Sequence, residues 1–568
     1  MQKKKWTLRP AQGSRADILD LSNTYQIPPL VAMILNKRGI TDPAEFLSPT
    51  LSVIHDPYLL RDMRPAVERI VSALKNHERI AVYGDYDVDG ITSTASLVRF
   101  LQACGGDVFY YIPDRKQEGY GVNSGAIDRI SAQGAKLLIT VDCGITAVLE
   151  VEHAGQVGMD VIITDHHECQ AHLPQAVAVI NPKRPDCDYP FKLLAGVGVV
   201  FKLMQALTDA LNLDKDAFFE IYAEIAAIGT IADVMPLLGE NRALVTYGLA
   251  HLAHSQNYGL RALIRQAGLD AHRLTAGSVS FALAPRINAA GRVGDPKNAV
   301  KMLLCDTMTE AADYAAILDE ENRARQQEEQ EILNQALAMI ESRRAFESES
   351  VLVLAGSGWH HGIIGIVASK ITERFYKPCI LISLDEGIGK GSGRSIKGFN
   401  LFAALSACGS HLFKFGGHEL AAGLTVEEDK IDDFRTAVNA YAASVLTEED
   451  MIPELWIDAN LPVEYMNLKT IQKLSVMAPY GMGNPAPIFA SAALSVREIR
   501  TMSEGKHLRL TLTKGRYLIS AVGFSMGEWA EILHPGDLID IAFNLEINRY
   551  RGTERAQILL KDLRFSAQ

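Results

Sequence analysis

The sequence lacks the features that mark several classes of protein. Its seven cysteines form no Cys-x-x-Cys pair, which argues against a zinc ribbon, a thioredoxin-type site and a disulfide framework. We therefore expect a reduced, cytosolic chain. No run reaches the about 18 consecutive apolar residues that a membrane helix needs, since Lys202 interrupts the apolar run Leu193–Met204. Met1–Trp6 is basic but no apolar segment follows it, so we expect neither a signal peptide nor a membrane partner.

An excess of positive charge is also absent. Lys plus Arg total 56 and Asp plus Glu total 68, so the formal net charge is −12 and a uniformly basic nucleic-acid binder is not expected. A local basic patch is compatible with this total, because a partner responds to the local field. Hydrophobic residues make up 48% and charged residues 22%, which is typical of globular proteins. At about 100–200 residues per domain, the chain is long enough for several domains.

The first half of the chain is predicted to hold a parallel sheet. Residues 1–75 indicate a helical lead-in with Pro breaks. Residues 76–310 are predicted to form one domain. From Arg79 to about Val245, short β-branched runs alternate with longer amphipathic stretches, which favours βαβ units with buried strands, and residues 246–310 are predicted to be mostly helical. Within this part, Ala284–Gly294 is expected to be a Pro/Gly-rich loop. The predicted strands are Ile80–Tyr83, Leu137–Val141 and Val161–Thr164.

The second half is predicted to contain a connecting helix and two further domains. Residues 311–345 form the helix, because Glu320–Arg344 lacks Gly and Pro and has few apolar residues, as in a largely solvated bridge. Residues 346–446 indicate a second α/β domain, which we expect to face the first across a cleft. Residues 454–568 alternate β-like runs with turns, which favours a small β-barrel or sandwich. These runs are Leu508–Leu512, Leu518–Val522, Leu538–Phe543 and Gln557–Leu560.

The densest group of carboxylates is Gly84-Asp85-Tyr86-Asp87-Val88-Asp89-Gly90. Carboxylates this close repel one another and raise each other's pKa, and a divalent cation relieves the repulsion. An EF-hand loop opens with the same pattern, but it requires a bidentate Glu at its position 12. Counted from Asp85 that position is Ser96, and a strand-like run precedes the motif, so we reject an EF-hand.

Three further segments contain acidic or imidazole groups. Val141-Asp142-Cys143-Gly144 and Asp165-His166-His167 each follow a predicted strand, and Asp233 ends Gly229-Thr230-Ile231-Ala232-Asp233. The carboxyl ends of parallel strands share one edge of a sheet, where ligands bind, so we expect these groups to converge. Singly, such an Asp is more often a helix N-cap and a His pair is ordinary polar surface, but together they favour a metal site. Carboxylates with one or two imidazoles and no thiolate suit Mn²⁺ or Mg²⁺, and their number indicates two ions.

These four motifs resemble those of the DHH phosphoesterase superfamily. Further segments are similar to its RecJ family of single-strand-specific exonucleases, and the resemblance runs from about residue 50 to the C-terminus. They are Leu283–Arg292, Gly391–Ser395 and Gly416-Gly417-His418. The resemblance implies an α/β fold in which a DHH parallel-sheet domain is joined by a long helix to a DHHA1-type domain, with a C-terminal OB-like β-barrel.

The resemblance also implies roles for the motif residues. Asp87 and Asp142 would hold one divalent cation. Asp89, His166 and Asp233 would hold a second cation together with Asp142, which would bridge the two. Asp85 and His167 would be catalytic residues that position groups or handle protons. The implied activity is stepwise hydrolysis of single-stranded DNA from the 5′ end to 5′-mononucleotides, in DNA recombination and repair. A single-strand-binding protein and a RecQ-type helicase are the implied partners of a monomer in the bacterial cytoplasm.

Several residues outside the metal motifs are predicted to bind the substrate. Gly391–Ser395 is interpreted either as an anion-binding loop of small residues with one guanidinium or as a Gly-Ser turn with a surface Arg. The resemblance implies the first, with Ser392 and Arg394 binding the 5′-terminal phosphate. Two interpretations of His360 remain open: packing, and a substrate contact at a helix N-terminus. His418 is expected to contact the substrate as well. The predicted strand contacts in Gly/Pro-bounded loops are Arg115, Tyr120, Arg286 and Arg292, with Tyr120 stacking on a base.

The predicted barrel is locally basic, with basic residues outnumbering acidic ones in Arg497–Arg516 and Arg549–Arg564. A basic β-barrel with interleaved aromatic residues resembles an OB-fold that tracks single strands, and a scaffolding barrel is the alternative. Gly196-Val197-Gly198 lacks the third Gly of a dinucleotide-binding fingerprint, so it is only weak evidence for a Rossmann-type cofactor site. Pro479–Pro485 is predicted to be a rigid turn that needs no chemistry.

Two other functions remain as alternatives. A DHH phosphoesterase for short oligonucleotides, cyclic dinucleotides or pyrophosphate would use the same metal core, but it needs neither a basic barrel nor a chain of this length. A non-catalytic replication scaffold is expected to have lost metal ligands, whereas every expected ligand is present here. The favoured mechanism has two cations lowering the pKa of a water that attacks the phosphorus in line.

Overall fold

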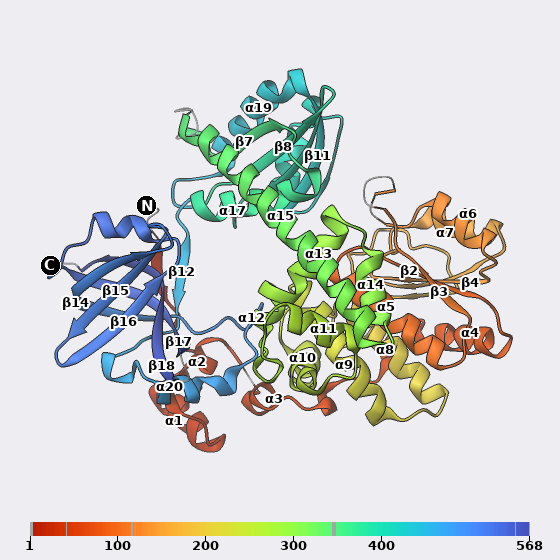
Figure 1. The fold of residues 1–568 in the computed structure, drawn as a ribbon, viewed down its shortest axis with the longest axis horizontal. Helices are drawn as coiled ribbons and strands as arrows, with labels where there is room; N and C mark the ends of the chain where they lie inside the picture. The colour runs from red at the N-terminus through yellow and green to blue at the C-terminus, as the bar shows by residue number, and fades with distance from the viewer. Residues whose placement is uncertain are drawn as a thin grey trace. The chain divides into compact units, whose positions relative to one another are not determined.

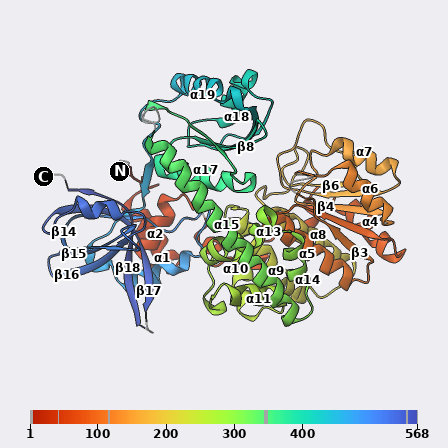
Figure 2. The same cartoon turned by 45° about the horizontal axis from the view of Figure 1, so that its top comes forward.

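The computed structural model describes residues 4–40, 42–114, 118–119, 121–342, 348–550 and 553–566. These residues form two compact units, and the first contains Thr7–Gly291, Asp295–Asp319 and Trp456–Gln568. The second contains Glu320–Leu455 with two short segments, Met1–Trp6 and Arg292–Gly294. Figures 1 and 2 show the elements of both units.

The first unit contains a five-stranded parallel sheet with the order β3-β2-β4-β5-β6. Helices α6 and α7 cover one face of the sheet, and α4, α5 and α8 cover the other (Figure 1). Burial on both faces explains why the strands are continuous apolar runs. The chain passes from β2 outward to β3 and then returns to β4 on the other side, so the strand order reverses between β2 and β4. The strands are β2 (Ile80–Gly84), β3 (Val108–Tyr111), β4 (Leu137–Val141), β5 (Asp160–Thr164) and β6 (Ala178–Ile180).

Helices surround this sheet and continue into a helical region with its own hydrophobic core. That core includes Leu260, Leu263 and Leu303, all buried. The helices before β6 are α1 (Arg15–Thr24), α2 (Pro29–Lys37), α3 (Pro43–Leu47), α4 (Met63–Lys75), α5 (Val88–Ala103), α6 (Ser124–Ala132) and α7 (Val148–Gln156). Those after it are α8 (Gly196–Ala210), α9 (Lys215–Ala232), α10 (Gly239–His251), α11 (Tyr258–Gln266), α12 (Ala276–Ser278), α13 (Ala284–Val293) and α14 (Lys297–Leu304).

The predicted loop at Ala284–Gly294 is wrong, because Ala284–Val293 form helix α13. A π-helical turn, η5 (Val279–Leu283), leads directly into this helix. Pro285 has no N–H to donate to the preceding turn, and the wider π turn just before it accommodates that loss. A Cβ on Gly291 would clash with the carbonyl oxygen of Tyr86. The Pro and Gly therefore reflect helix entry and close packing, not a loop.

The second unit contains a five-stranded mixed sheet with the order β10-β11-β9-β8-β7. The predicted loop at Gly391–Ser395 is wrong, because most of it belongs to strand β9. A Cβ on Gly391 or Gly393 would lie 2.8 Å from Leu424 or Leu401, so these glycines make room for packed leucines. The elements are β7 (Leu352–Ser357), α17 (His361–Phe375), β8 (Cys379–Asp385), β9 (Ile388–Arg394), α18 (Leu401–Ala407), β10 (Lys414–Gly417), β11 (Ala421–Glu427) and α19 (Ile431–Val445).

The predicted long helix is present as α15 (Met308–Ser342), and one stripe along it is buried while the rest of its surface is partly or fully exposed. Buried side chains recur along it every three or four residues, so one stripe of the helix is covered. The stripe includes polar groups, among them Arg325, which forms an ion pair with Glu329 one turn later. The buried residues are Ala311, Ala315, Leu318, Asp319, Asn322, Arg325, Glu329, Ile332 and Ala336.

Five strands near the C-terminus close into a barrel, because β14 pairs with β17 as well as with β15. This barrel completes the predicted fold class, which is confirmed: a parallel-sheet domain, a long helix, a second α/β domain and a C-terminal barrel. The barrel strands are β14 (Phe489–Met502), β15 (His507–Lys514), β16 (Tyr517–Gly523), β17 (Leu538–Tyr550) and β18 (Thr553–Phe565), and the short β13 (Ala459–Asn460) pairs with β14. A separate two-stranded sheet contains β1 (Lys5–Leu8) and β12 (Glu454–Ile457), and α20 spans Leu468–Leu474.

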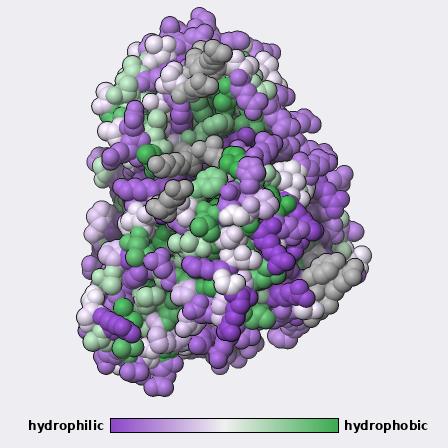
Figure 3. Space-filling model, turned by 90° about the vertical axis from the view of Figure 1, so that its left-hand side faces the viewer, coloured by the Kyte–Doolittle hydropathy of each residue, from purple (hydrophilic) through white to green (hydrophobic). Residues whose placement is uncertain are grey.

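The outer surface is mainly polar on the face that Figure 3 shows, where hydrophobic residues form separate patches among hydrophilic ones. Within the described ranges, we find no helix with the length and apolar character needed to cross a membrane.

Candidate metal centre

The carboxyl ends of three neighbouring strands bring the predicted metal ligands together. Asp85 follows β2, and Asp87 caps helix α5 by accepting a hydrogen bond from the Gly90 N–H at 3.0 Å. Asp142 follows β4 directly, and His166 follows β5. The reversal of strand order between β2 and β4 makes this edge the expected ligand site of an open α/β sheet.

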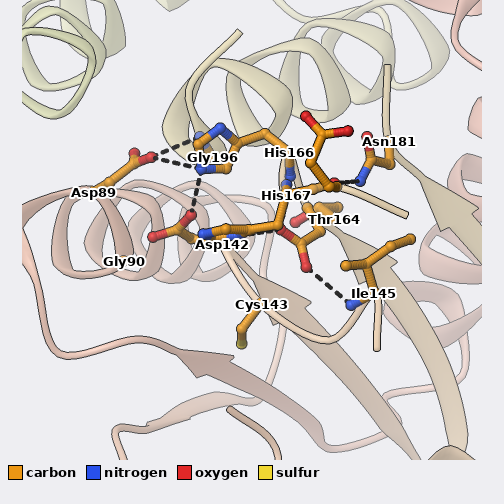
Figure 4. A network of polar contacts seen from close by, with 12 residues as sticks. Asp89, Gly90, Asp142, Cys143, Ile145, Thr164, His166, His167, Asn181 and Gly196 are labelled. Carbon is orange, nitrogen blue, oxygen red and sulfur yellow. Dashed lines mark hydrogen bonds and ion pairs between the residues drawn. The ribbon is translucent and has the colours of Figure 1, made fainter. Parts of the chain in front are cut away.

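Asp233 joins this group from the C-terminus of helix α9, where it is the capping residue. His166 Nε2 lies 3.2 Å from Asp142 Oδ1, 3.6 Å from Asp233 Oδ2 and 3.8 Å from Asp89 Oδ2. Figure 4 shows Asp89, Asp142 and His166 pointing toward one another. One imidazole nitrogen thus faces three carboxylates from different elements.

Three sets of side chains have ligand atoms within 4.8 Å of one another. They are Asp85, Asp87 and Asp142; Asp89, His166 and Asp233; and Asp142, His166 and His167. Asp142 and His166 belong to two sets each. The structure therefore brings together all seven residues that the sequence predicted for catalysis or metal binding, with Asp142 between two sets.

The burial of these groups fits a cation. Asp89 is 1% exposed and Asp142 2%, and in the described part of the chain Asp142 Oδ1 and Asp233 Oδ2 are buried without a hydrogen-bond donor. A buried carboxylate oxygen without a partner is costly, and a cation would compensate for it. Carboxylate oxygens with one or two imidazoles are the ligands that Mn²⁺ or Mg²⁺ prefers.

The local electrostatics agree with this. Burial raises the pKa of Asp89 and of Asp142, and the neighbouring carboxylates raise both further. Burial, with the charge of Asp87, raises the pKa of Asp233 to about 7. Burial and the adjacent His167 lower the pKa of His166 to about 4, which keeps its imidazole in the neutral form that binds metals.

The N-terminus of helix α8 supports the site. The N–H groups of Gly196 and Val197 donate to the two oxygens of Asp89, each at 2.7 Å. A Cβ on Gly196 would lie 2.5 Å from Asp142 Oδ1, so this position needs a glycine. Asp142 itself has a φ of 58°, an uncommon backbone conformation that clusters at functional sites. The sequence motif Gly196-Val197-Gly198 thus supports the candidate ligands, a role that its spacing did not indicate.

Asp165 is a second residue that the sequence prediction left without a role. It accepts hydrogen bonds from the N–H of Ile145 at 2.9 Å, the N–H of His166 at 2.7 Å and Nδ1 of His167 at 2.7 Å. Burial raises the pKa of Asp165, but the hydrogen bond and charge of His167 outweigh it and the net pKa is lowered. Asp165 therefore stays ionised and orients His167. The signal in the sequence was its place in the Asp-His-His motif.

Ser392 and Arg394 lie on one face of strand β9 in the second unit. Arg394 Nη1 donates to Ser392 Oγ at 3.2 Å. Burial lowers the pKa of Arg394, and among the described residues it forms no ion pair. A Cβ on Gly365 of helix α17 would lie 2.9 Å from Ser392 Oγ, so the helix backbone closely approaches this pair. A half-buried guanidinium without a carboxylate partner is suited to an anionic ligand.

Two arginines that were predicted to contact the DNA strand from loops lie on a helix instead. Arg286 and Arg292 lie on helix α13 rather than in loops, because the Pro and Gly around them serve helix entry and packing. Arg286 forms an ion pair with the buried Asp319 at 2.9 Å. Arg292 Nη1 donates to the carbonyl of Gly362 at 2.9 Å.

Four further residues were predicted to contact the substrate, and the structure describes two of them, His360 and His418. The His360 ring caps helix α17 by accepting the Gly362 N–H at 3.1 Å. The exposed His418 donates its N–H to the carbonyl of Ala421 at 2.8 Å. Arg115 and Tyr120 lie outside the described residues.

A parallel sheet with buried Asp and His side chains at its switch point, followed by a second α/β domain and a closed barrel, defines a DHH-type protein. Residues 79–230 match the family model "DHH family, N-terminal domain" and residues 348–444 the model "DHHA1 domain". Residues 457–562 match the model "RecJ OB domain".

Comparison with known proteins identifies the family. The chain is 40% identical over 568 residues to the single-stranded-DNA-specific exonuclease RecJ of Bacillus subtilis, covering 99% of this chain and 71% of that protein. It is 36% identical to the RecJ of Dickeya dadantii, covering 94% of this chain and 96% of that protein. The chain belongs to the RecJ family, which confirms the resemblance inferred from the sequence.

A solved structure agrees with this family over the whole chain. The crystal structure of RecJ from Thermus thermophilus in complex with Mn²⁺ has a TM-score of 0.85 and 33% identity, covering 99% of this chain and 80% of that one. The same protein in complex with Mg²⁺ has a TM-score of 0.80 and 31% identity, covering 99% of this chain and 79% of that one.

Proposed function

We propose that this chain is a metal-dependent exonuclease that hydrolyses single-stranded DNA stepwise from the 5′ end to 5′-mononucleotides, in DNA recombination and repair. The central observation is the buried cluster of Asp89, Asp142, His166 and Asp233 at the switch point of the sheet, in a chain of the RecJ family. Two divalent cations, Mn²⁺ or Mg²⁺, are its cofactors, and the T. thermophilus relative binds either ion.

The cluster divides into two ligand sets that share Asp142. Asp87 and Asp142 hold one cation, while Asp89, Asp142, His166 and Asp233 hold the other. Bound cations supply a water of lowered pKa and neutralise charge on the phosphoryl oxygens. The protein's own groups hold this arrangement: the α8 N–H groups fix Asp89, and Asp165 orients His167.

The remaining catalytic residues act beside the ligands. Asp85 and His167 position the substrate or handle a proton, and the closeness of each to candidate ligand atoms supports this role. Ser392 and Arg394 bind the 5′-terminal phosphate, which sets the polarity and the one-nucleotide step. Arg286, Arg292, His360 and His418, together with Arg115 and Tyr120, complete the proposed substrate contacts.

The barrel guides the strand. Arg500 on β14 and Arg509 on β15 are direct cross-strand partners. Arg500 is paired with Glu498 on its own strand, whereas Arg509 forms no ion pair with any described residue, so its charge is open to an anionic ligand. Phe524 is 58% exposed, and its ring lies edge-on to His507 at 5.2 Å. Cations beside an exposed aromatic ring suit a sugar-phosphate backbone with stacked bases.

The proposed domain division is a lead-in (1–75), a catalytic domain (76–310), a connecting helix (311–345), a substrate-binding domain (346–446) and a nucleic-acid-binding barrel (454–568). We also propose a monomer that acts in the bacterial cytoplasm with a single-strand-binding protein and a RecQ-type helicase. Family resemblance supports these two partners.

A product assay tests the proposed activity. A 30-nucleotide strand with a 5′-labelled phosphate is incubated with the chain and Mn²⁺, and the first labelled product should be a 5′-mononucleotide. A labelled oligonucleotide as first product would contradict stepwise action from the 5′ end.

A second comparison tests the alternative of a small-nucleotide phosphoesterase. The variant Arg509→Ser should cleave a dinucleotide normally and bind the 30-nucleotide strand at least tenfold more weakly. Arg549→Ser is the matched control, because Arg549 is paired with Glu554 at 2.7 Å, whereas Arg509 forms no ion pair with any described residue. Equal binding of the long strand by both variants would favour the small-nucleotide alternative.

A further inference from the structure

The helical region from Asn241 to Gly294 is depleted of negative charge. Asp270 is its only carboxylate, whereas the chain as a whole has a net charge of −12. The six basic side chains in the same segment are Arg242, Arg261, Arg265, Arg273, Arg286 and Arg292, of which Arg273 pairs with Asp270 and Arg286 with Asp319 of helix α15. A local positive field on an acidic protein favours contact with an anionic ligand at that place.

An open cavity of about 580 Å³ lies in this segment, between helix α11 and the short helices η3 (Leu252–His254) and η4 (Ala271–Arg273). Apolar side chains including Leu252, Ile264 and Leu269 line it. Its polar lining includes His254, Arg261 and Arg265, and no carboxylate lines it. A volume of this size falls within the ~300–1,000 Å³ range of small-molecule sites.

The two arginines that line the cavity are unlike the other arginines nearby. Arg242 is buried and donates to four backbone carbonyls, and Arg273 pairs with Asp270 at 3.3 Å. By contrast, Arg261 and Arg265 are exposed, and neither forms an ion pair with any described residue. They are four residues apart on α11, so their guanidinium groups leave the same face of the helix.

We propose that this cavity is a nucleotide-binding site separate from the metal centre. Two guanidinium groups four residues apart can clamp one phosphate, since each forms paired hydrogen bonds with its oxygens. The apolar lining suits the face of a base, and Gln256 and Ser255 offer polar groups to its edge. The nucleotide is either a free 5′-mononucleotide or one unit of a bound strand, and the chemistry of recognition is the same.

Binding without cleavage tests this site. The full chain carrying Arg394→Ala is titrated calorimetrically in EDTA with 5′-dAMP and, separately, with a 12-nucleotide dA strand. The Arg394→Ala background removes the phosphate contact proposed for the terminal nucleotide. Adding Arg261→Ala/Arg265→Ala should weaken dAMP binding about tenfold per arginine, as expected for loss of a charge-assisted contact. Arg273→Ala is the matched control and should leave binding unchanged.

The two ligands distinguish the source of the nucleotide. Weaker binding of dAMP in the double variant identifies a free mononucleotide, and weaker binding of the strand alone identifies a unit of bound DNA. The proposal would be overturned if the double variant bound each ligand as tightly as Arg273→Ala does. It would also be overturned if neither ligand bound to the chain. Because EDTA prevents cleavage, these outcomes are independent of whether the chain is an exonuclease.

Discussion

Replacing Gly196 by Ala tests the geometry of the metal centre without removing any candidate ligand. The new Cβ would lie 2.5 Å from Asp142 Oδ1 and 2.6 Å from its Cβ, although real Cβ atoms stay beyond 3.0 Å. Helix α8 is fixed at this point, because the N–H groups of Gly196 and Val197 hold Asp89. The Asp142 carboxylate must therefore move.

The displacement sets the size of the effect. To restore ordinary van der Waals contact, at roughly 3.5 Å, the carboxylate must move by about 1 Å. A misplacement of about 1 Å at a reacting centre costs about 100-fold in rate. We expect kcat for a single strand to fall about 100-fold and Mn²⁺ affinity to weaken about 10- to 100-fold, as for residues that support metal ligands.

The assay compares Gly196→Ala with Gly198→Ala, two residues further along the same buried helix. At Gly198 the nearest atom to a new Cβ is the Leu194 Cβ at 3.3 Å, so a slight shift of that side chain accommodates it. Cleavage is measured across a Mn²⁺ titration, Mn²⁺ binding by calorimetry, and folding by thermal unfolding in EDTA. If Gly196→Ala cleaved DNA and bound Mn²⁺ as Gly198→Ala does, the inferred position of Asp142 would be wrong.

Three further predictions concern stability and substrate binding. Burial raises the pKa of Glu224 from 4.5 to about 7, against a hydrogen bond from Ser255, so the folded chain keeps a proton that the unfolded chain releases. Glu224 therefore contributes stability that is lost as the pH rises from about 4.5 to about 7, and Glu224→Gln should reduce the wild-type loss by about 3 kcal/mol at pH 8. Urea unfolding at pH 5 and pH 8 measures it, and an unchanged pH dependence refutes it. Arg242→Met leaves four backbone carbonyls without their buried donor and should lower the free energy of unfolding by at least about 3 kcal/mol; a loss below about 1 kcal/mol in urea contradicts this. Arg394→Ala should cleave 5′-phosphorylated and 5′-hydroxyl strands at equal rates with unchanged Mn²⁺ binding, and a retained preference would exclude Arg394 from phosphate recognition.

The convergence of the candidate ligands could be predicted because it depends on local patterns. Each of Asp85, Asp142 and His166 follows a run of apolar residues that is recognisable as a strand buried on both faces. Once the sheet is parallel, the ends of these strands must share one edge. The parallel sheet and the convergence of the candidate ligands therefore followed from the sequence.

The supporting contacts could not be predicted in this way, because they join segments far apart in sequence. The hydrogen bonds from Gly196 and Val197 to Asp89 span more than a hundred residues, and a glycine gives no sign of what it packs against. The same limit explains the errors at Gly291 and Gly393, where glycine permits close packing in a helix and a strand. The low helix and strand propensity of glycine assigned both residues to loops, because propensity contains no information about the distant residues against which a glycine packs.

The central claim is most directly tested with a 3′-labelled, 5′-phosphorylated single strand in Mn²⁺ or Mg²⁺, beside its blunt duplex. Progressive shortening of the single strand alone, abolished in an Asp142→Ala variant that remains folded, is the predicted result. The account would be contradicted if Asp142→Ala shortened the single strand at the normal rate under limiting metal. It would also be contradicted if the folded, metal-loaded wild-type chain did not shorten the strand.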